Sequence, residues 1–167
     1  MTGMNTIMFA AAAVSLMGCL SSIPTAVAQA NEHEPASGHE AAHDFHPNFL
    51  GVFFGLTDEG RLEGIALGIE YERRLNKSFG IGVLAEHTYG DLDFTVYAVP
   101  FAYHTGPWKF YVAPGIEDGD HGSEFLIRIG GEYAFEVGAW EFAPQIDVDF
   151  VDGEETVVVG ITIGKGF

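Results

Sequence analysis

Four histidines lie close together in residues 31–47, NEHEPASGHEAAHDFHP. The stretch from His39 to His43 matches H-E-x-x-H, in which two histidines one helical turn apart bind Zn²⁺ and the glutamate acts as a base. Such a site needs a buried helix beside a cleft and a third ligand, whereas Pro35, Gly38 and Pro47 surround this stretch. We therefore expect a flexible polar segment without protease activity. The alternative is weak divalent-metal binding by the clustered imidazoles of His33, His39, His43 and His46.

A second set of catalytic residue types lies in the segment EDGDHGSE, where Ser123 is beside His121 and Glu124. A serine, a histidine and an acid could supply the nucleophile, the base and the orienting group of a hydrolase. No group that would form an oxyanion hole can be identified beside them, and the segment lacks the spacing of a calcium-binding loop. His87 and His104 each stand alone, and a lone histidine is more often a hydrogen-bonded structural residue than a catalyst. We expect no enzymatic activity and no cofactor.

The composition favours a β-rich chain of one domain. The chain has 167 residues, of which 22 are glycine, 13% are aromatic and only 19% are charged, whereas about a quarter of residues are charged in an average domain. The 24 acids against 7 Lys and Arg give a net charge of −17, which excludes a nucleic acid as an expected partner. The single cysteine, Cys19, excludes an intramolecular disulfide.

Residues 1–30 have the pattern of a signal peptide. They contain no Asp, Glu, Lys or Arg, and an apolar run from Ile7 to Leu20 precedes small-residue A-x-A patterns that end at Ala28 and Ala30. Two alternatives are a retained membrane anchor and lipoprotein processing at Cys19. We expect secretion and cleavage after Ala28 or Ala30.

From residue 48 onward, apolar and polar residues alternate in eight segments. These are residues 48–57, 63–75, 79–90, 93–104, 108–117, 124–137, 140–151 and 155–167. Connections after the even-numbered segments are tight, and those after the odd-numbered segments are acidic and longer, holding 12 of the 24 acids. This pattern predicts an all-β fold, an eight-stranded antiparallel up-and-down transmembrane β-barrel over residues 48–167. The first and fourth segments are apolar on both faces, so their sequence does not show which side chains point inward. The alternation alone does not exclude a soluble β-sandwich, whose strands would alternate in the same way.

Aromatic residues mark one end of the predicted barrel. Phe79, Trp108 and Trp140 each open a strand just after a tight turn, and Phe167 closes the last strand at the same end. On the outer face they would form an aromatic girdle at a membrane interface. Five of the seven cations cluster at this end: Arg73, Arg74, Lys77, Lys109 and Lys165.

Residues 48–167 resemble the small eight-stranded outer-membrane proteins of the OmpA/OmpX transmembrane-barrel type. The terminal VVVGITIGKGF is similar to the C-terminal signal that the barrel-assembly machinery reads, although Lys165 stands where an apolar or aromatic residue is usual. The segments HPNFLGVFFGLT, LGIEYERRL and FVDGE resemble a group of small barrels without an assigned activity. The resemblance implies a Gram-negative outer membrane with both barrel termini in the periplasm. It also implies contacts with outer-membrane lipid, lipopolysaccharide and the assembly machinery.

The inward faces of the strands carry most of the remaining charges. A lumen of eight strands is just wide enough for its own side chains, so charges there must pair or take up protons. With a two-residue turn at Gly138-Ala139, Arg128 faces Asp149, Glu132 faces Gln145 and Glu136 faces Glu141, with Lys109 one strand away. We predict an ion pair between Arg128 and Asp149 and a Lys109 bridge over the two lower glutamates of this ladder. The predicted charge network comprises Glu70, Glu86, Lys109, Arg128, Glu132, Glu136, Glu141, Asp147 and Asp149.

The sequence favours a non-enzymatic integral barrel with an envelope-structural role, or one that interacts with other surfaces through its acidic loops. A narrow cation-preferring channel through the acidic lumen is the main alternative. A lipid-A-modifying enzyme that uses Ser123 and a soluble periplasmic barrel that binds a small ligand are two further alternatives.

Overall fold

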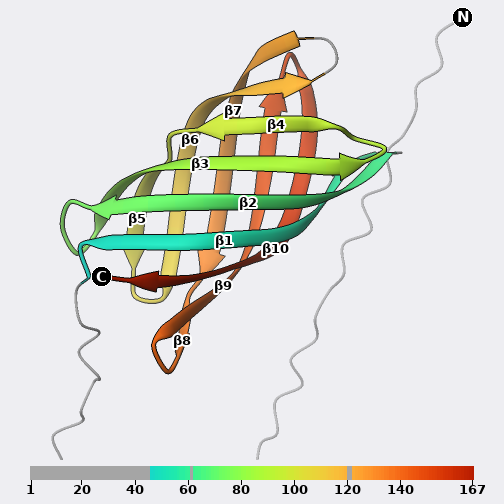
Figure 1. The fold of residues 1–167 in the computed structure, drawn as a ribbon. Helices are drawn as coiled ribbons and strands as arrows, with labels where there is room; N and C mark the ends of the chain where they lie inside the picture. The colour runs from blue at the N-terminus through green and yellow to red at the C-terminus, as the bar shows by residue number, and fades with distance from the viewer. Residues whose placement is uncertain (1–45, 61, 120–121) are drawn as a thin grey trace, which may run out of the picture. The chain divides into compact units, whose positions relative to one another are not determined.

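The computed structural model describes residues 46–60, 62–119 and 122–167. In these ranges the backbone forms β-strands joined by turns, as Figure 1 shows in chain order. The strands are β1 (Asn48–Glu59), β2 (Leu62–Arg74), β3 (Phe79–Gly90), β4 (Phe94–Ala98), β5 (Phe101–Thr105), β6 (Trp108–Gly119), β7 (Gly122–Tyr133), β8 (Phe135–Val137), β9 (Trp140–Val151) and β10 (Glu154–Gly166). No helix in this described part of the chain is long and apolar enough to cross a membrane.

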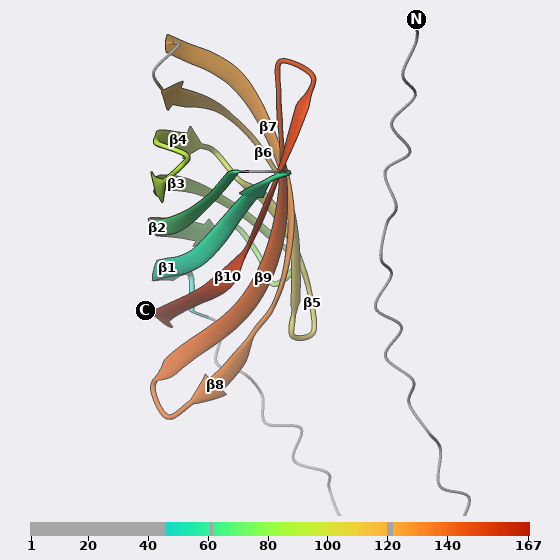
Figure 2. The same cartoon turned by 90° about the vertical axis from the view of Figure 1, so that its right-hand side faces the viewer.

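The strands form one antiparallel sheet that closes on itself. Its order is β10-β1-β2-β3-β4-β6-β7-β9, and β9 also pairs with β10. β5 continues the path of β4, and β8 continues that of β7, so the chain is a closed eight-stranded barrel. In Figures 1 and 2, β1 to β4 lie on one side of the barrel and β6, β7 and β9 on the other. The predicted fold class is confirmed.

Two prolines on neighbouring strands separate β4 from β5. Pro100 lies in the gap, and Pro114 of β6 faces Val99. A proline has no N–H to donate to the ladder, but the carbonyl of Pro100 still accepts from Gly82 N at 2.9 Å, and that of Pro114 from Val99 N at 2.9 Å. The register against β3 and β6 is the same on both sides of the gap. The two segments are therefore one strand of the barrel.

The two ends of the barrel differ in charge. We call the end where β1 begins and β10 finishes the terminal end, and the opposite one the acidic end. At the acidic end the β1–β2, β6–β7 and β9–β10 ladders run on to the pairs Glu59↔Leu62, Gly119↔Gly122 and Val151↔Glu154. In the β9–β10 turn, Asp152 and Gly153 have φ of 46° and 89°, as in the Asp-Gly turns of tight hairpins. The prediction of longer loops at this end is wrong, because the strands run on through the acidic segments.

Along the middle of the barrel, charged side chains point inward and most of the large exposed side chains are apolar. Arg128, Asp147 and Asp149 are 1%, 0% and 0% exposed, whereas Leu56 and Phe125 are 66% and 64% exposed. This holds along each strand because successive side chains point to opposite faces. Leu50, Val52, Phe54 and Leu56 point outward from β1, and Phe49 and Phe53 point inward.

Glycines that face the lumen explain why Phe49 and Phe53 of β1 can point inward. A Cβ on Gly55 or Gly160 would collide with the Phe53 ring, and one on Gly164 would collide with the ring of Phe49. The absent side chains leave the space that the two rings fill. A second apolar group, around Leu84, Val96 and Leu126, fills the lumen on the other side.

Candidate functional site

Arg128 of β7 is the largest fully buried side chain among the described residues. Its Nε donates to Asp149 Oδ1 at 2.6 Å and its Nη2 to Asp149 Oδ2 at 2.7 Å. Its Nη1 and Nη2 donate to the two carboxylate oxygens of Glu86 at 3.1 Å and 2.8 Å. These two bidentate pairs are the strongest arrangement available to a guanidinium in a protein. The predicted contact between Arg128 and Asp149 is present.

The backbone register positions this cluster. Arg128 faces Asp149 across the β7–β9 ladder, because the Gly138-Ala139 turn fixes the offset between the strands. Glu86 comes from β3, which pairs with neither β7 nor β9, so its contact with Arg128 crosses the lumen. One guanidinium thereby ties two distant parts of the wall together.

A chain of neutral and acidic groups continues from this cluster. Tyr111 Oη donates to Asp147 Oδ1 at 2.5 Å, and Gln145 Nε2 donates to Asp147 Oδ2 at 2.9 Å. Thr162 Oγ1 donates to Gln145 Oε1 at 2.8 Å. A Cβ on Gly130 would collide with both Asp147 and Tyr111, so this glycine makes the bond between them possible. The carboxylate of Asp147, 4.0 Å from Arg128, joins the two groups.

Lys109 is the centre of a second cluster, nearer the terminal end. Its Nζ contacts Glu132 and lies 3.4 Å from Glu70 Oε1 and 3.4 Å from Glu72 Oε2. Glu132 is its partner across the β6–β7 ladder, whereas Glu70 and Glu72 reach it from β2 across the lumen. The prediction placed Lys109 over the two lower glutamates of the ladder, where Glu136 faces Glu141, whereas the ion pairs of Lys109 are with Glu132 of β7 and with Glu70 and Glu72 of β2.

His104 belongs to this second cluster, which sequence reasoning missed. Its Nε2 lies 2.6 Å from Glu72 Oε1, and both side chains are buried. His104 faces Lys109 across the β5–β6 ladder, so the two must point to the same face of the sheet. The Gly106-Pro107 turn together with the inward Lys109 was therefore a signal that could have placed His104 in the lumen.

The remaining residues of the predicted network lie at the terminal mouth of the lumen. Glu136 is exposed and faces the half-buried Glu141 across the β8–β9 ladder. A pocket of about 30 Å³ opens beside Glu141, Arg74 and His104, which is room for about one water molecule. At this mouth the side chains of Glu72, Lys109, Glu132 and Glu141 therefore leave little open space.

The predicted aromatic girdle lies on the outer wall at the terminal end. Phe79, Trp108, Trp140 and Phe167 are 53%, 46%, 55% and 58% exposed. Further rings extend the set, because Trp108 contacts Tyr133 edge to face with centroids 4.9 Å apart and Phe79 lies 5.5 Å from Tyr103.

The residues proposed for metal binding and for hydrolysis fall largely outside the described ranges. His33, His39, His43 and His121 are not in them, and His46 is exposed. Ser123 Oγ donates to Asp118 Oδ1 at 2.5 Å across the hairpin, which uses its proton in a contact with a carboxylate. In the described part of the chain, no group of three or more His, Cys, Asp or Glu residues is placed to hold a metal ion.

The architecture defines a class: a small closed barrel of eight antiparallel strands with an apolar outer wall. Among solved structures, the chain is similar to the N-terminal β-barrel domain of Pseudomonas aeruginosa OprF, with a TM-score of 0.52 and 14% identity over 73% of this chain and 98% of that one. Ail of Yersinia pestis (TM-score 0.49, 13% identity, 74% and 100% covered) and Neisserial surface protein A (0.49, 11%, 72% and 96%) are further neighbours. No protein-family model and no curated protein matches the chain. The chain therefore has the fold of the small eight-stranded outer-membrane barrels, and the resemblance in the sequence is confirmed at the level of the fold.

Proposed function

We propose that this protein is a non-enzymatic, integral outer-membrane barrel with a closed lumen, which serves as an envelope component and presents an acidic surface outside the cell. The observation that carries the proposal is the inside-out distribution of side chains. Ile65, Val83 and Ile146 are 58%, 56% and 56% exposed on the outer wall, whereas Glu86 and Glu132 are 4% and 3% exposed in the lumen.

A continuous apolar wall on all sides of a barrel is unfavourable in water. Soluble monomers rarely expose apolar patches larger than a few hundred Å², and here every full-length strand contributes several large apolar side chains to the outside. A bilayer removes this penalty, and closure of the sheet leaves no unpaired ladder facing lipid. The outer wall therefore favours a lipid environment.

The two ends support one orientation. The terminal end carries the aromatic girdle and the exposed cations Arg73, Lys77 and Lys165. The acidic end carries Asp58, Asp118 and Asp152 on strand ends and turns. We infer that the terminal end faces the periplasm. The acidic end would then meet the lipopolysaccharide layer, where divalent cations can bridge its carboxylates to phosphates.

A closed lumen is favoured over a cation-preferring channel. Buried carboxylates outnumber the lumenal cations Lys109 and Arg128, as a cation path would require. However, Arg128 lies across the lumen between β3 and β9 and is held on both sides by bidentate pairs. We expect no single-channel conductance in planar bilayers. Single-channel current steps whose size changes when Glu70 is replaced by Gln would instead support the channel.

Fractionation tests membrane integration. We expect the full chain to stay in the urea-washed outer-membrane pellet and to shift in gel mobility on boiling. Ile129→Lys is the discriminating variant, because Ile129 is 50% exposed on the outer wall of β7. A lysine in the bilayer interior destabilises a barrel by about 2–4 kcal/mol, and by about 0–1 near the interface, so Val137→Lys, which is 58% exposed at the end of β8 beside the Gly138-Ala139 turn, is the matched control. Release of the wild-type chain, or equal behaviour of the two variants, would point to a soluble barrel.

A lipid-A-modifying activity is tested separately. Ser123 is the only described serine near the acidic end, and its hydroxyl is engaged by Asp118. We expect the mass spectrum of lipid A to be the same in cells with the wild-type chain, with Ser123→Ala and without the protein. A modified lipid A that disappears with Ser123→Ala would establish an enzyme.

A further inference from the structure

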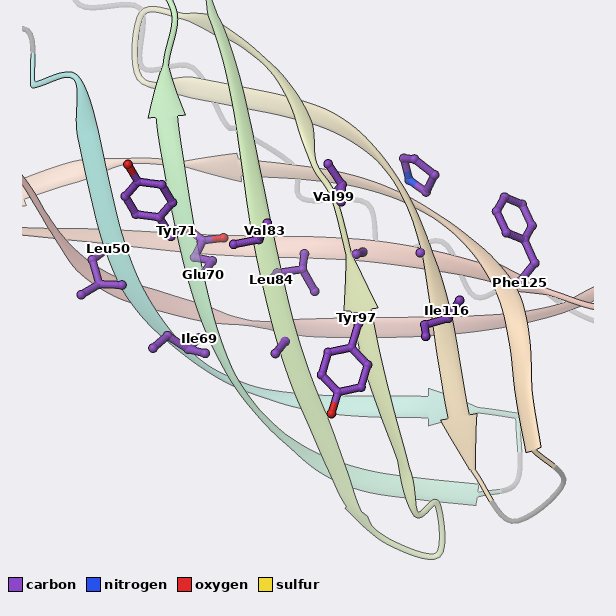
Figure 3. Close-up of a pocket in the computed structure, with 14 residues that line it drawn as sticks. Leu50, Ile69, Glu70, Tyr71, Val83, Leu84, Tyr97, Val99, Ile116 and Phe125 are labelled. Atoms are coloured by element: carbon purple, nitrogen blue, oxygen red, sulfur yellow. The ribbon is translucent and has the colours of Figure 1, made fainter.

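An apolar groove crosses the outer wall from the terminal end toward the acidic end. It has a volume of about 690 Å³, within the range of about 300–1,000 Å³ that is usual for small-molecule pockets. Figure 3 shows the side chains along it, from Leu50 and Tyr71 at one end to Ile116 and Phe125 at the other. The groove is thus one defined depression in the belt that the proposed function places in lipid.

Small and flat residues at neighbouring positions make the groove. Ala85 faces Ile69 on one side and Tyr97 on the other in the sheet register, so a short side chain lies between two long ones. One row away, Val99 and Pro114 line the groove at the interruption between β4 and β5. The groove therefore runs across the strands between these two rows of outward side chains, and Ala85 is a low point in one row, between the longer side chains of Ile69 and Tyr97.

The length of the groove matches one leaflet of a bilayer. From Leu50 of β1 to Phe125 of β7 it crosses five strand-to-strand steps, which is about 24 Å at roughly 4.8 Å per step. Strands of such barrels are tilted by about 40°, so the groove climbs about 15 Å along the membrane normal. This is about half of the ~30 Å hydrocarbon core. A single acyl chain from one leaflet fits this rise.

Two exposed cations lie at the terminal-end mouth of the groove. Lys165 of β10 is the cross-strand partner of Leu50, and directly opposed Cβ atoms are about 5 Å apart. Arg73 is two residues beyond Tyr71 on the same outward face of β2. In the described part of the chain, neither cation forms an ion pair with a carboxylate. Both are free to meet an anion at the membrane interface.

The neutral side chain of Asn48 positions Arg73. Its Nη1 donates to Asn48 Oδ1 at 2.7 Å, and Tyr71 Oη donates to the same oxygen at 2.9 Å. Asn48 Nδ2 in turn donates to the main-chain oxygen of Phe167 at 3.1 Å. A guanidinium has five N–H donors, so the bond to Asn48 orients Arg73 and leaves its other donors for a ligand.

We propose that the groove holds an acyl chain of an anionic phospholipid from the inner leaflet, with the lipid phosphate bound by Arg73 and Lys165. The inference rests on the proposed membrane location. Charge complementarity selects the headgroup, since a phosphate is the anion present at this depth. The position of both cations at the terminal end selects the periplasmic leaflet over the lipopolysaccharide leaflet. It also gives a role to Lys165, which departs from the usual pattern of a C-terminal barrel strand.

The test is native mass spectrometry of the full chain folded in mixed micelles that contain equal amounts of phosphatidylglycerol and phosphatidylcholine with the same acyl chains. We expect the wild-type chain to retain phosphatidylglycerol preferentially. Each cation near a membrane surface contributes about fivefold to the binding of an anionic lipid. Arg73→Gln with Lys165→Gln should therefore reduce the preference by up to about 25-fold. Lys77→Gln, which removes an exposed charge from the neighbouring β2–β3 turn, is the matched control and should leave the preference unchanged.

A second pair of variants tests the groove itself. Ala85→Phe adds a ring to the low point of the row that borders the groove, without changing the charge, and should lower the amount of retained phosphatidylglycerol. Val148→Phe, on the outer wall of β9 away from the groove, should not. Every variant is first required to give the heat-modifiable band of the folded barrel.

The outcomes separate the two proposals. A folded, membrane-inserted chain that retains both lipids equally, or loses its preference equally with Lys77→Gln, would overturn the lipid site and leave the membrane barrel intact. Preferential retention of lipid A in a parallel sample with lipopolysaccharide would assign the groove to the other leaflet and also overturn the proposal. Failure of the wild-type chain to insert into bilayers would overturn the proposed function instead.

Discussion

Replacing Arg128 by methionine tests how the lumen is held together. The side chain is 1% exposed and makes four hydrogen bonds to Glu86 and Asp149, which are 4% and 0% exposed. Removing one partner of a buried pair destabilises a protein by about 3–5 kcal/mol, because the other charge stays buried without compensation. Here the carboxylate of Asp147 also lies 4.0 Å from the guanidinium. We therefore expect a loss near the upper end, about 5 kcal/mol.

The assay is urea unfolding of the full chain in lipid vesicles, followed by the fluorescence of Trp108 and Trp140 and by gel mobility without boiling. Arg128→Met should shift the unfolding midpoint to much lower urea. Lys77→Met removes an exposed cation and should change the stability by at most about 1 kcal/mol.

A compensated variant separates charge from packing. Arg128→Met combined with Glu86→Gln and Asp149→Asn keeps the shapes and removes the uncompensated charges, so it should recover at least half of the lost stability. Two results would refute the reasoning. One is a loss below about 1 kcal/mol for Arg128→Met, and the other is a compensated variant no more stable than Arg128→Met.

Three further predictions use the same unfolding assay. Gly130→Ala places a Cβ against Asp147 and Tyr111 and should destabilise the barrel by about 1–3 kcal/mol. Gly131→Ala, whose Cβ would have its nearest neighbour 3.4 Å away, should leave the stability almost unchanged. Equal effects of the two variants would contradict the inference that Gly130 makes room for the bond between Tyr111 and Asp147. Phe53→Ala empties a buried site and should reduce the free energy of unfolding by about 3–5 kcal/mol. Phe54→Ala, at a side chain that is 47% exposed on the outer wall, should reduce it much less. The reverse order would mean that the side chains of β1 point the other way. Tyr111→Phe leaves the buried Asp147 without one donor and should cost about 1–3 kcal/mol, and an unchanged midpoint would show that this bond adds nothing to stability.

The fold could be predicted from the sequence because the alternation of apolar and polar residues is nearly complete in most strands. The pairing of Arg128 with Asp149 followed from one turn, Gly138-Ala139, because a two-residue turn fixes every later pair in the hairpin. The same reasoning at Gly106-Pro107 places His104 opposite Lys109, so the inward position of His104 was also within reach.

Other features were beyond the reach of the sequence. β1 is apolar on both faces because Phe49 and Phe53 fill the lumen beside glycines while Leu50 and Phe54 face outward, so its pattern gives no phase. Contacts across the lumen, such as those of Lys109 with Glu70 and Glu72, join strands that do not pair. They depend on the diameter and tilt of the closed barrel, which no local pattern encodes.

Closure of the barrel also has a kinetic consequence. The ladder that completes the ring joins β1 to β10, and its outermost hydrogen bonds link Asn48 to Phe167, 119 residues apart in the chain. Contacts between such distant residues form slowly, because a long stretch of chain must be ordered first. Before they form, β1 and β10 both present unpaired edges on which another chain could add a strand. This protein should therefore be most prone to aggregation in the interval before the two edge strands meet. A factor that shields both edges from other chains during this interval would raise the yield of folded barrel without changing the stability of the folded state.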